Sequence, residues 1–161
     1  MRTILFVCTG NTCRSPMAEA LARAMVGDGR IEGAHEGGPD DEESGELFFA
    51  SAGVSASDGV PTTIETINAL ERLKIEFSGR SKALTARMIR NADLVLCMTR
   101  AQRDAAAFLV YDDADAQSRI LTLDEDADIP DPIGQSQDAY DQLAQRLQTL
   151  LQDRLSKLLQ Q

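Results

Sequence analysis

The residues best equipped for chemistry lie in one short segment near the start of the chain. It reads Cys8-Thr9-Gly10-Asn11-Thr12-Cys13-Arg14-Ser15. A loop of this length between a strand and a helix can turn successive backbone N–H groups inward, where the positive end of the helix dipole reinforces them. Such a loop binds a dianion. Gly10 and Asn11 tolerate the backbone torsions that it needs, and Arg14 offers a planar fork for two phosphate oxygens.

Cys8 lies at the base of this predicted loop. The field that binds a dianion also favours its thiolate, and the Ser15 hydroxyl is placed to donate a hydrogen bond to the sulfur. A thiolate held against a phosphoryl group can attack phosphorus in line, giving a cysteinyl-phosphate that water then hydrolyses. We expect no metal and no other cofactor, because the amides and Arg14 stabilise the equatorial oxygens. The loop lacks the Gly-Lys-Ser/Thr ending of a nucleotide-binding loop, which argues against an NTPase.

This chemistry also needs an acid for the leaving group and then a base for the attacking water. The one histidine, His35, lies in an acidic segment and is a poor candidate. Asp131 is the better candidate, because the prolines on either side of it stiffen the backbone that holds its carboxylate. An Asp-Pro pair taken alone is more often a plain turn.

The elements that position these residues alternate along the chain. Strands are predicted at residues 3–8, 47–52 and 93–98 and near 120–121, and helices at 62–73 and 83–92 and from about residues 15, 101 and 137. Ser15 is expected as the N-cap of the first helix, with Pro16 at its first position. In the last helix, leucines from Leu143 to Leu158 repeat at helical spacing and form a stripe for packing onto a sheet. The alternation predicts an α/β fold, a three-layer sandwich with a central parallel four-stranded sheet and helices on both faces.

Length and composition fit one domain spanning residues 1–161. The chain has 16 basic and 26 acidic residues and a net charge of -10, so we expect no nucleic-acid and no membrane partner. Much of the acid falls in a glycine-rich segment at about 27–46, which we interpret as an insertion loop. No apolar run is long enough to span a bilayer or serve as a secretory signal, which favours a cytoplasmic location. Three cysteines and one histidine at these spacings indicate neither a disulfide framework nor a zinc site.

Fourteen consecutive residues, Phe6 to Glu19 (FVCTGNTCRSPMAE), closely resemble the signature of low-molecular-weight protein-tyrosine phosphatases. Three further stretches follow in family order: Ser51-Ala52-Gly53, Ala92 to Leu96 with Met98-Thr99, and Asp131-Pro132. The resemblance therefore spans nearly the whole chain, except the segment at about 27–46. It implies that Cys8 is the nucleophile, Arg14 the phosphate clamp and Asp131 the general acid. It also implies that Asn11 stabilises the loop and Ser15 the thiolate.

The other two cysteines have different expected roles. The resemblance implies that Cys13 can form a reversible disulfide with Cys8 and so protect it from overoxidation. The alternative for Cys13 is a small, packed side chain. Cys97 lies in a predicted buried strand, so we expect it in the core.

Two positions bear on which phosphorylated residue is the substrate. Tyrosine-directed members usually carry an apolar branched residue where this chain has Thr12, and the loop resembles the protein-arginine phosphatase branch. A Thr hydroxyl can accept a hydrogen bond from a guanidinium that an Ile methyl would only desolvate; the alternative is a near-isosteric exchange without consequence. Tyrosine-directed members typically have an aromatic residue two positions beyond the acid, where it would stack on a phenyl ring, and here Ile133 stands there.

These residues predict a metal-independent phosphatase that acts on phosphoarginine in proteins and releases inorganic phosphate. A protein-tyrosine phosphatase with the same machinery is the nearest alternative. Thiol-dependent arsenate reduction uses a similar loop, but it needs resolving cysteines in a later mobile segment, and only Cys97 follows Cys13. A non-catalytic phosphoprotein-binding module would need neither Cys8 nor Asp131.

Overall fold

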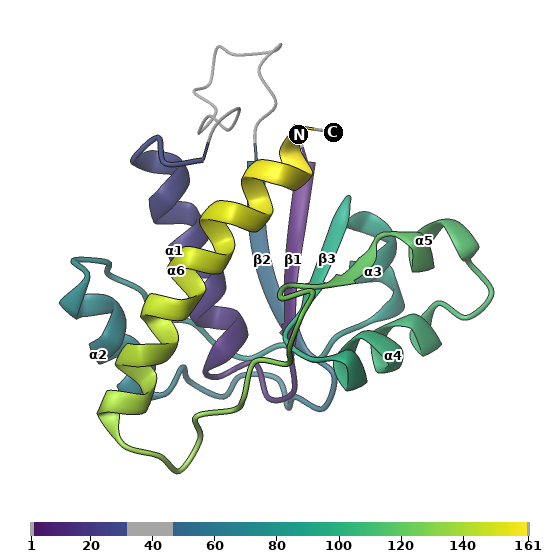
Figure 1. The fold of residues 1–161 in the computed structure, drawn as a ribbon. Coiled ribbons are helices and arrows are strands. Elements are labelled where there is room, and N and C mark those ends of the chain that lie inside the picture. Colours follow the sequence, from purple (N-terminus) through teal and green to yellow (C-terminus); the bar gives the residue numbers. More distant parts are fainter. Residues whose placement is uncertain (1, 32–46, 161) are drawn as a thin grey trace.

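The computed structural model describes residues 2–31 and 47–160 (Figure 1). Most of the acidic segment expected at about 27–46 therefore lies outside the described residues. The four strands are β1 (Arg2–Cys8), β2 (Leu47–Gly53), β3 (Leu94–Cys97) and β4 (Ile120–Thr122). The helices are α1 (Arg14–Gly27), α2 (Ile64–Arg72), α3 (Ala86–Asn91), α4 (Arg100–Leu109), α5 (Ala114–Ser118) and α6 (Gln137–Leu159).

The strands form one parallel sheet in the order β2-β1-β3-β4. Successive side chains of β1 point to opposite faces, because a strand repeats every two residues. Ile4 and Phe6 pack in the core shared with α1, α2 and α6, whereas Leu5 and Val7 pack in the core shared with α3, α4 and α5. Figure 1 shows these helices on the two sides of the sheet. The predicted three-layer α/β architecture is confirmed.

The leucine stripe of the last helix is confirmed as a buried face. Its fully or largely buried members are Leu143, Leu147, Leu151 and Leu155. Helix α6 lies against α1 and α2, and its leucines share one core with Ile4 and Phe6 of the sheet. The stripe thus fixes α6 over the face of the sheet from which Cys8 also projects.

The predicted start of the first helix is wrong. Helix α1 begins at Arg14, with Cys13 at the N-cap position and no side-chain capping hydrogen bond. Ser15 and Pro16 are therefore its second and third residues. Pro16 fits there because the N–H groups of the first helical turn have no intrahelical acceptor. The Ser15 hydroxyl is directed at Cys8 instead of capping the helix.

Helix α5 is an element that the sequence did not predict. It has only five residues, and Asp113 caps it by accepting a hydrogen bond from the backbone N–H of Ala116 at 2.9 Å. That hydrogen bond holds the pKa of Asp113 below its usual value. The helix covers the end of β4 on the face away from α6.

Candidate active site

A loop of residues 9–13 joins the carboxyl end of β1 to the start of α1. Ligands of open α/β sheets bind at this edge, outside the carboxyl ends of the strands. Asn11 takes a left-handed φ of 56°, as its type predicts. Gly10, in contrast, has no positive φ, and a Cβ on it would meet only the Thr12 hydroxyl oxygen, at 3.8 Å. The expectation that Gly10 supplies an unusual torsion is therefore wrong.

The loop presents a set of backbone donors. The backbone N–H of Asn11 donates to Cys8. Within the part of the chain that the structure describes, the backbone N–H groups on either side of it donate to no protein acceptor: those of Thr9, Gly10, Thr12, Cys13 and Arg14. They lie at the positive end of the α1 dipole. Unpaired amides in this setting form an anion-binding concavity, with the first turn of the helix completing it.

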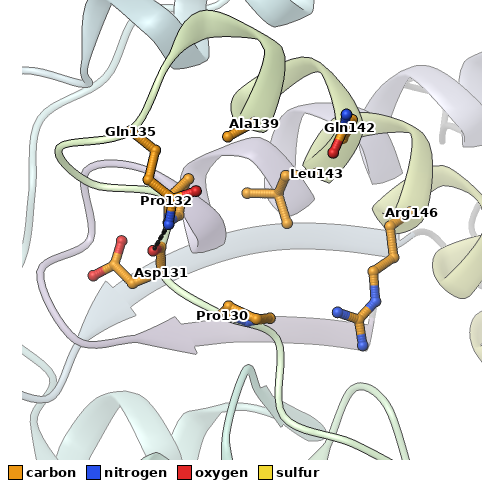
Figure 2. Close-up of a pocket in the computed structure, with 8 residues that line it drawn as sticks. All are labelled: Pro130, Asp131, Pro132, Gln135, Ala139, Gln142, Leu143 and Arg146. Carbon is orange, nitrogen blue, oxygen red and sulfur yellow. Dashed lines mark hydrogen bonds between the residues drawn. The ribbon is translucent and has the colours of Figure 1, made fainter.

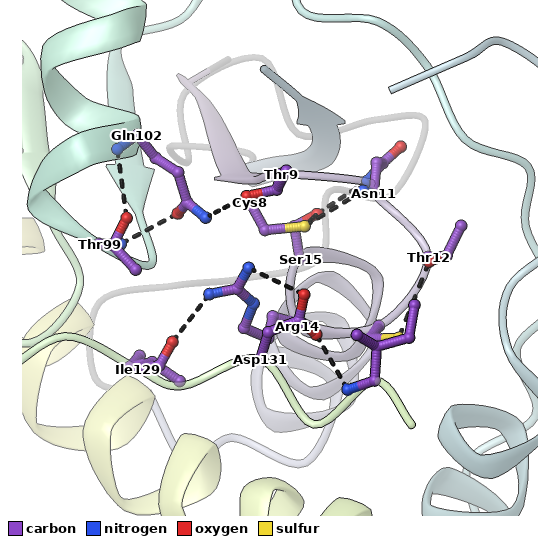
Figure 3. Close-up of polar contacts among 12 residues, drawn as sticks. Cys8, Thr9, Asn11, Thr12, Arg14, Ser15, Thr99, Gln102, Ile129 and Asp131 are labelled. Carbon is purple, nitrogen blue, oxygen red and sulfur yellow. Dashed lines mark hydrogen bonds and ion pairs between the residues drawn. The ribbon is translucent and has the colours of Figure 1, made fainter. Parts of the chain in front are cut away.

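The sulfur of Cys8 receives two hydrogen bonds at the base of the loop (Figure 3). The backbone N–H of Asn11 donates to Sγ at 3.2 Å, and the Ser15 hydroxyl lies 2.9 Å from it. The side-chain amide of Asn11 donates to the Ser15 oxygen at 2.8 Å, so the Ser15 proton goes to one of two acceptors, Sγ of Cys8 at 2.9 Å or the Ala52 carbonyl at 3.5 Å. The sulfur is the nearer of the two, and as an anion it is also the stronger acceptor. Two donors aimed at one buried sulfur stabilise its anion.

The side chain of Asn11 ties the loop to two more distant segments. Its Nδ2 also donates to the Ser51 hydroxyl on β2, at 3.0 Å, and its Oδ1 accepts from the backbone N–H of Lys82 at 2.9 Å. Asn11 is buried, so these bonds hold it in place without competition from water. The left-handed turn and the donors around Cys8 are therefore fixed together.

Arg14 and Asp131 lie together across the loop mouth. The buried guanidinium of Arg14 donates to the Ile129 carbonyl at 2.8 Å, and another of its nitrogens lies 3.5 Å from Oδ2 of Asp131. The Asp131 side chain is 41% exposed. Its Oδ1 accepts from the backbone N–H of Ile133 at 3.1 Å, which orients the carboxylate. The structure thus places Asp131 beside Arg14, which lies 117 residues earlier in the chain, on the loop that begins at Cys8.

Thr12 is half-buried on the wall of the loop nearest α2. Its carbonyl accepts from both the N–H and the hydroxyl of Thr63, at 3.0 and 3.3 Å, and Thr63 is the N-cap of α2. Ile133, the second residue expected to affect specificity, is 61% exposed and offers no aromatic surface. One candidate specificity residue is therefore held in the loop, while the other projects into solvent.

All three cysteines are free thiols and all three are buried. Sγ of Cys13 lies 3.5 Å from the Thr63 hydroxyl and 3.6 Å from the Tyr140 hydroxyl. Burial, together with the contact to Cys13, raises the pKa of Tyr140 above its usual value. Cys97 is fully buried, which confirms its expected place in the core, and burial raises the pKa of its thiol to about 12. The pairing of Cys8 with Cys13 stays a prediction.

A buried carboxyl lies beneath the loop. Glu19, on α1, is 3.2 Å from Arg23 and lines a cavity of about 160 Å³ together with Asn11 and Ser51. Burial raises the pKa of Glu19, and the positive charge of Arg23 partly offsets this effect. A second cavity, of about 210 Å³, lies between the Asp131 loop and Leu143 and Arg146 of α6. Figure 2 shows the Asp131 carboxylate pointing away from it. Neither cavity contains Cys8.

Several residues that hold the site were missed by sequence reasoning. They are Ser51, Thr63, Lys82, Gln102 and Ile129. Lys82 and Ile129 act through backbone atoms, so their side chains carry no signal. Gln102 does carry one, because Thr-x-x-Gln before a helical stretch is a capping-box pattern. Across residues 2–31 and 47–160, no group of three or more His, Cys, Asp and Glu side chains could hold a metal ion, and no helix there could cross a membrane.

Comparison with known proteins finds that the chain is similar to phosphatases. The model of the low molecular weight phosphotyrosine protein phosphatase family matches residues 3–161. The protein-arginine-phosphatase of Bacillus subtilis (strain 168) is 35% identical, covering 96% of this chain and 95% of its own. The low molecular weight protein-tyrosine-phosphatase PtpB of Staphylococcus epidermidis is 30% identical, covering 92% and 93%. A solved structure of YwlE arginine phosphatase, a mutant with a phosphorylated active site serine, superposes with a TM-score of 0.83 at 33% identity, covering 99% and 96%.

Proposed function

The chain belongs to the low molecular weight phosphotyrosine protein phosphatase family, and from that premise we propose that it hydrolyses phosphoarginine in proteins through a cysteinyl-phosphate. The observation that carries this proposal is the surroundings of Cys8. Its sulfur accepts from the Asn11 amide and faces the Ser15 hydroxyl, at the base of a loop of unpaired amides. A thiolate so placed lies under any phosphoryl group that the loop binds.

The reaction takes place in two steps. Sγ of Cys8 attacks phosphorus, the S–P bond forms, and the bond from phosphorus to the guanidino nitrogen breaks. Asp131, protonated at this stage, gives its proton to the departing nitrogen. Water then attacks phosphorus, Asp131 takes a proton from it, and inorganic phosphate leaves as the S–P bond breaks. The loop amides and Arg14 stabilise the charge on the phosphoryl oxygens in both steps.

Two observations favour phosphoarginine over phosphotyrosine. Thr12 places a hydroxyl group in the loop wall, and a hydroxyl can accept a hydrogen bond from a guanidinium. The position of Ile133 offers no ring on which a phenyl group could stack. The Bacillus subtilis relative, itself named for phosphoarginine, supports this choice. The tyrosine-directed alternative is supported by the Staphylococcus epidermidis relative.

The deciding experiment compares the two substrates side by side. Peptides of one sequence carry either phosphoarginine or phosphotyrosine, and kcat/KM is measured for each with the fully reduced protein. We expect a marked preference for phosphoarginine. An equal or reversed preference would assign the protein to the tyrosine-directed alternative.

A second experiment tests the covalent step. Denaturing quench during turnover, followed by mass spectrometry, should find phosphate on Cys8. Cys8→Ser should remove turnover, whereas the matched control Cys97→Ser should keep it, because the Cys97 side chain packs in the core on the opposite face of the sheet from Cys8. If turnover survives Cys8→Ser, the mechanism is wrong. Consumption of reduced thioredoxin that depends on arsenate would instead indicate arsenate reduction.

The same chemistry suggests where the protein acts and how oxidation affects it. Cys8 must stay reduced to attack phosphorus, which fits a reducing compartment such as the cytoplasm. A disulfide with Cys13 would block the nucleophile reversibly and keep it from higher oxidation states. Both suggestions belong to the proposal and rest on the same thiolate.

A further inference from the structure

A buried amide on α4 contacts the phosphate-binding loop. Gln102 is 3% exposed and is the third residue of α4, just beyond the carboxyl end of β3. Its Nε2 donates to the Thr9 hydroxyl oxygen at 3.0 Å, as Figure 3 shows. Thr9 directly follows Cys8 and is itself exposed. Gln102 is thus a buried group that touches the exposed rim of the loop.

The orientation of this amide is fixed by its other end. Oε1 of Gln102 accepts from the backbone N–H of Thr99 at 3.0 Å, and the Thr99 hydroxyl accepts from the N–H of Gln102 at 3.2 Å. This reciprocal pair is a capping box. A backbone N–H can only donate, so the oxygen of the amide must face Thr99, and the nitrogen must face Thr9.

The direction of the bond to Thr9 has a consequence for the loop. An amide nitrogen is only a donor, so the Thr9 oxygen accepts and its own proton points elsewhere. The Thr9 carbonyl is held separately, by the N–H of Ser55 at 3.0 Å. Thr9 is therefore held by two segments, the one that follows β2 and the first turn of α4. Its hydroxyl proton remains available for donation beside the unpaired loop amides. A bound dianion is the strongest acceptor that could reach it.

We propose that Gln102 is a positioning residue for catalysis, which holds Thr9 so that its hydroxyl donates to the phosphoryl group bound in the loop. This inference rests on the proposed function, because it assigns a donor to the same phosphate site. Gln102 does not touch the substrate. It acts through Thr9, and it links the capping of α4 to the geometry of the loop.

The substitution Gln102→Glu separates this role from a merely structural one. Glu serves as well as Gln at the third position of a capping box, so α4 keeps its cap. A carboxylate at a position only 3% exposed lowers the melting temperature, so binding is measured at 25 °C on protein shown to be folded. A carboxylate, however, can only accept, so the Thr9 hydroxyl must turn its proton toward it and away from the loop. We expect inorganic phosphate to bind about tenfold more weakly, as the loss of one charge-assisted hydrogen bond predicts.

The experiment measures phosphate binding by calorimetry, together with kcat and KM for the phosphoarginine peptide. Gln145→Glu, which adds the same charge at an exposed position of α6, is the matched control and should bind phosphate like the parent. Thr9→Val removes the hydroxyl while keeping the shape of the side chain. If Gln102 acts through Thr9, the loss caused by Gln102→Glu is smaller in the Thr9→Val background than in the parent.

Unchanged phosphate binding in Gln102→Glu overturns the proposal. So does an effect that is the same in both backgrounds, because the added charge or a loss of stability would act whether or not Thr9 carries a hydroxyl. Phosphate binding requires no turnover, so the two proposals fail separately. A parent protein that binds phosphate and shows the coupling, but hydrolyses no phosphoarginine, would contradict the proposed function alone.

Discussion

The chemistry at Cys8 depends on the direction of the hydrogen bonds among a few neighbouring polar groups. Asn11 gives its side-chain N–H groups to Ser15 and Ser51, and the Ser15 proton has the Cys8 sulfur at 2.9 Å as its nearest acceptor, with the Ala52 carbonyl farther away at 3.5 Å. None of these groups carries a full charge, and all are buried. Single substitutions in this set should therefore act first on the shape of the loop and on the donors around the sulfur.

Thr12→Ile is the single change most informative about specificity. The carbonyl of Thr12 is held by Thr63 whatever side chain the residue carries, so the loop should keep its shape. We expect kcat/KM for phosphoarginine to fall about tenfold, because a guanidinium N–H loses its acceptor, while phosphotyrosine turnover is kept or rises. Thr12→Val controls for the lost hydroxyl at constant size. A preference unmoved by both variants means that Thr12 has no role in specificity.

Cysteine labelling should distinguish the core thiol from the nucleophile. Burial raises the pKa of Cys97 to about 12, so at pH 8 this thiol is almost entirely protonated as well as inaccessible. We expect iodoacetamide to leave Cys97 unmodified in the folded protein and to modify it after denaturation in guanidinium, as read by peptide mass spectrometry. Inorganic phosphate should slow the labelling of Cys8 only. Labelling of Cys97 at the rate of Cys8 in the folded protein would contradict its place in the core.

Among the helices and strands, those with a continuous apolar run or a regular spacing of apolar residues were predictable from the sequence. The four strands and the leucine stripe of α6 follow from such patterns, because burial on a sheet face or a helix face demands them. Helix α5 was not predictable, since five residues set by the Asp113 cap leave no period to detect. The start of α1 was misjudged because Ser15 has the residue type of a cap but bonds to Cys8 instead.

The candidate site was predictable only in part, for a related reason. Cys8, Arg14 and the loop between them are adjacent in sequence, and Asp131 was marked by its prolines. The groups that hold them come from other elements, such as Lys82 and Gln102, which lie 71 and 93 residues from their loop partners. Contacts at such separation depend on tertiary packing, which no local pattern encodes.

Gly53→Ala tests how closely β2 approaches the loop. An added Cβ would lie 2.4 Å from the Thr9 carbonyl oxygen and 3.0 Å from the Asn11 amide nitrogen, so backbone must move. Because that amide donates to Cys8, we expect kcat/KM to fall at least about tenfold. Gly10→Ala should lose less, since its Cβ would meet only the Thr12 hydroxyl at 3.8 Å. Equal losses of kcat/KM in the two variants would mean that the close approach of Gly53 does not determine the conformation of the loop.

Considered as a whole, the molecule places its catalytic residues at one edge of its larger core, where Cys8 and Cys13 belong to the same cluster as the α6 leucines. The loop, the Arg14 clamp and the Asp131 segment gather at the carboxyl ends of the strands, as Figure 1 and Figure 3 together show. The larger core lies between the sheet and the pair α1 and α6. Residues in the part of that core away from the loop should therefore affect stability without taking part in chemistry.

Leu151→Ala tests this separation. Leu151 is fully buried on α6 and belongs to the core shared with α1 and the sheet, so the truncation leaves a cavity and should cost about 2–5 kcal/mol of unfolding free energy. For a chain of this length, that loss lowers the melting temperature by roughly 5–20 °C. Leu150→Ala, at a partly buried neighbour, should cost much less. At 25 °C both variants should keep the parent's kcat/KM, because neither side chain contacts the loop. A fall in kcat/KM of the still-folded Leu151→Ala protein would show that the packing of α6 reaches the catalytic edge, most directly through Tyr140 and its contact with Cys13.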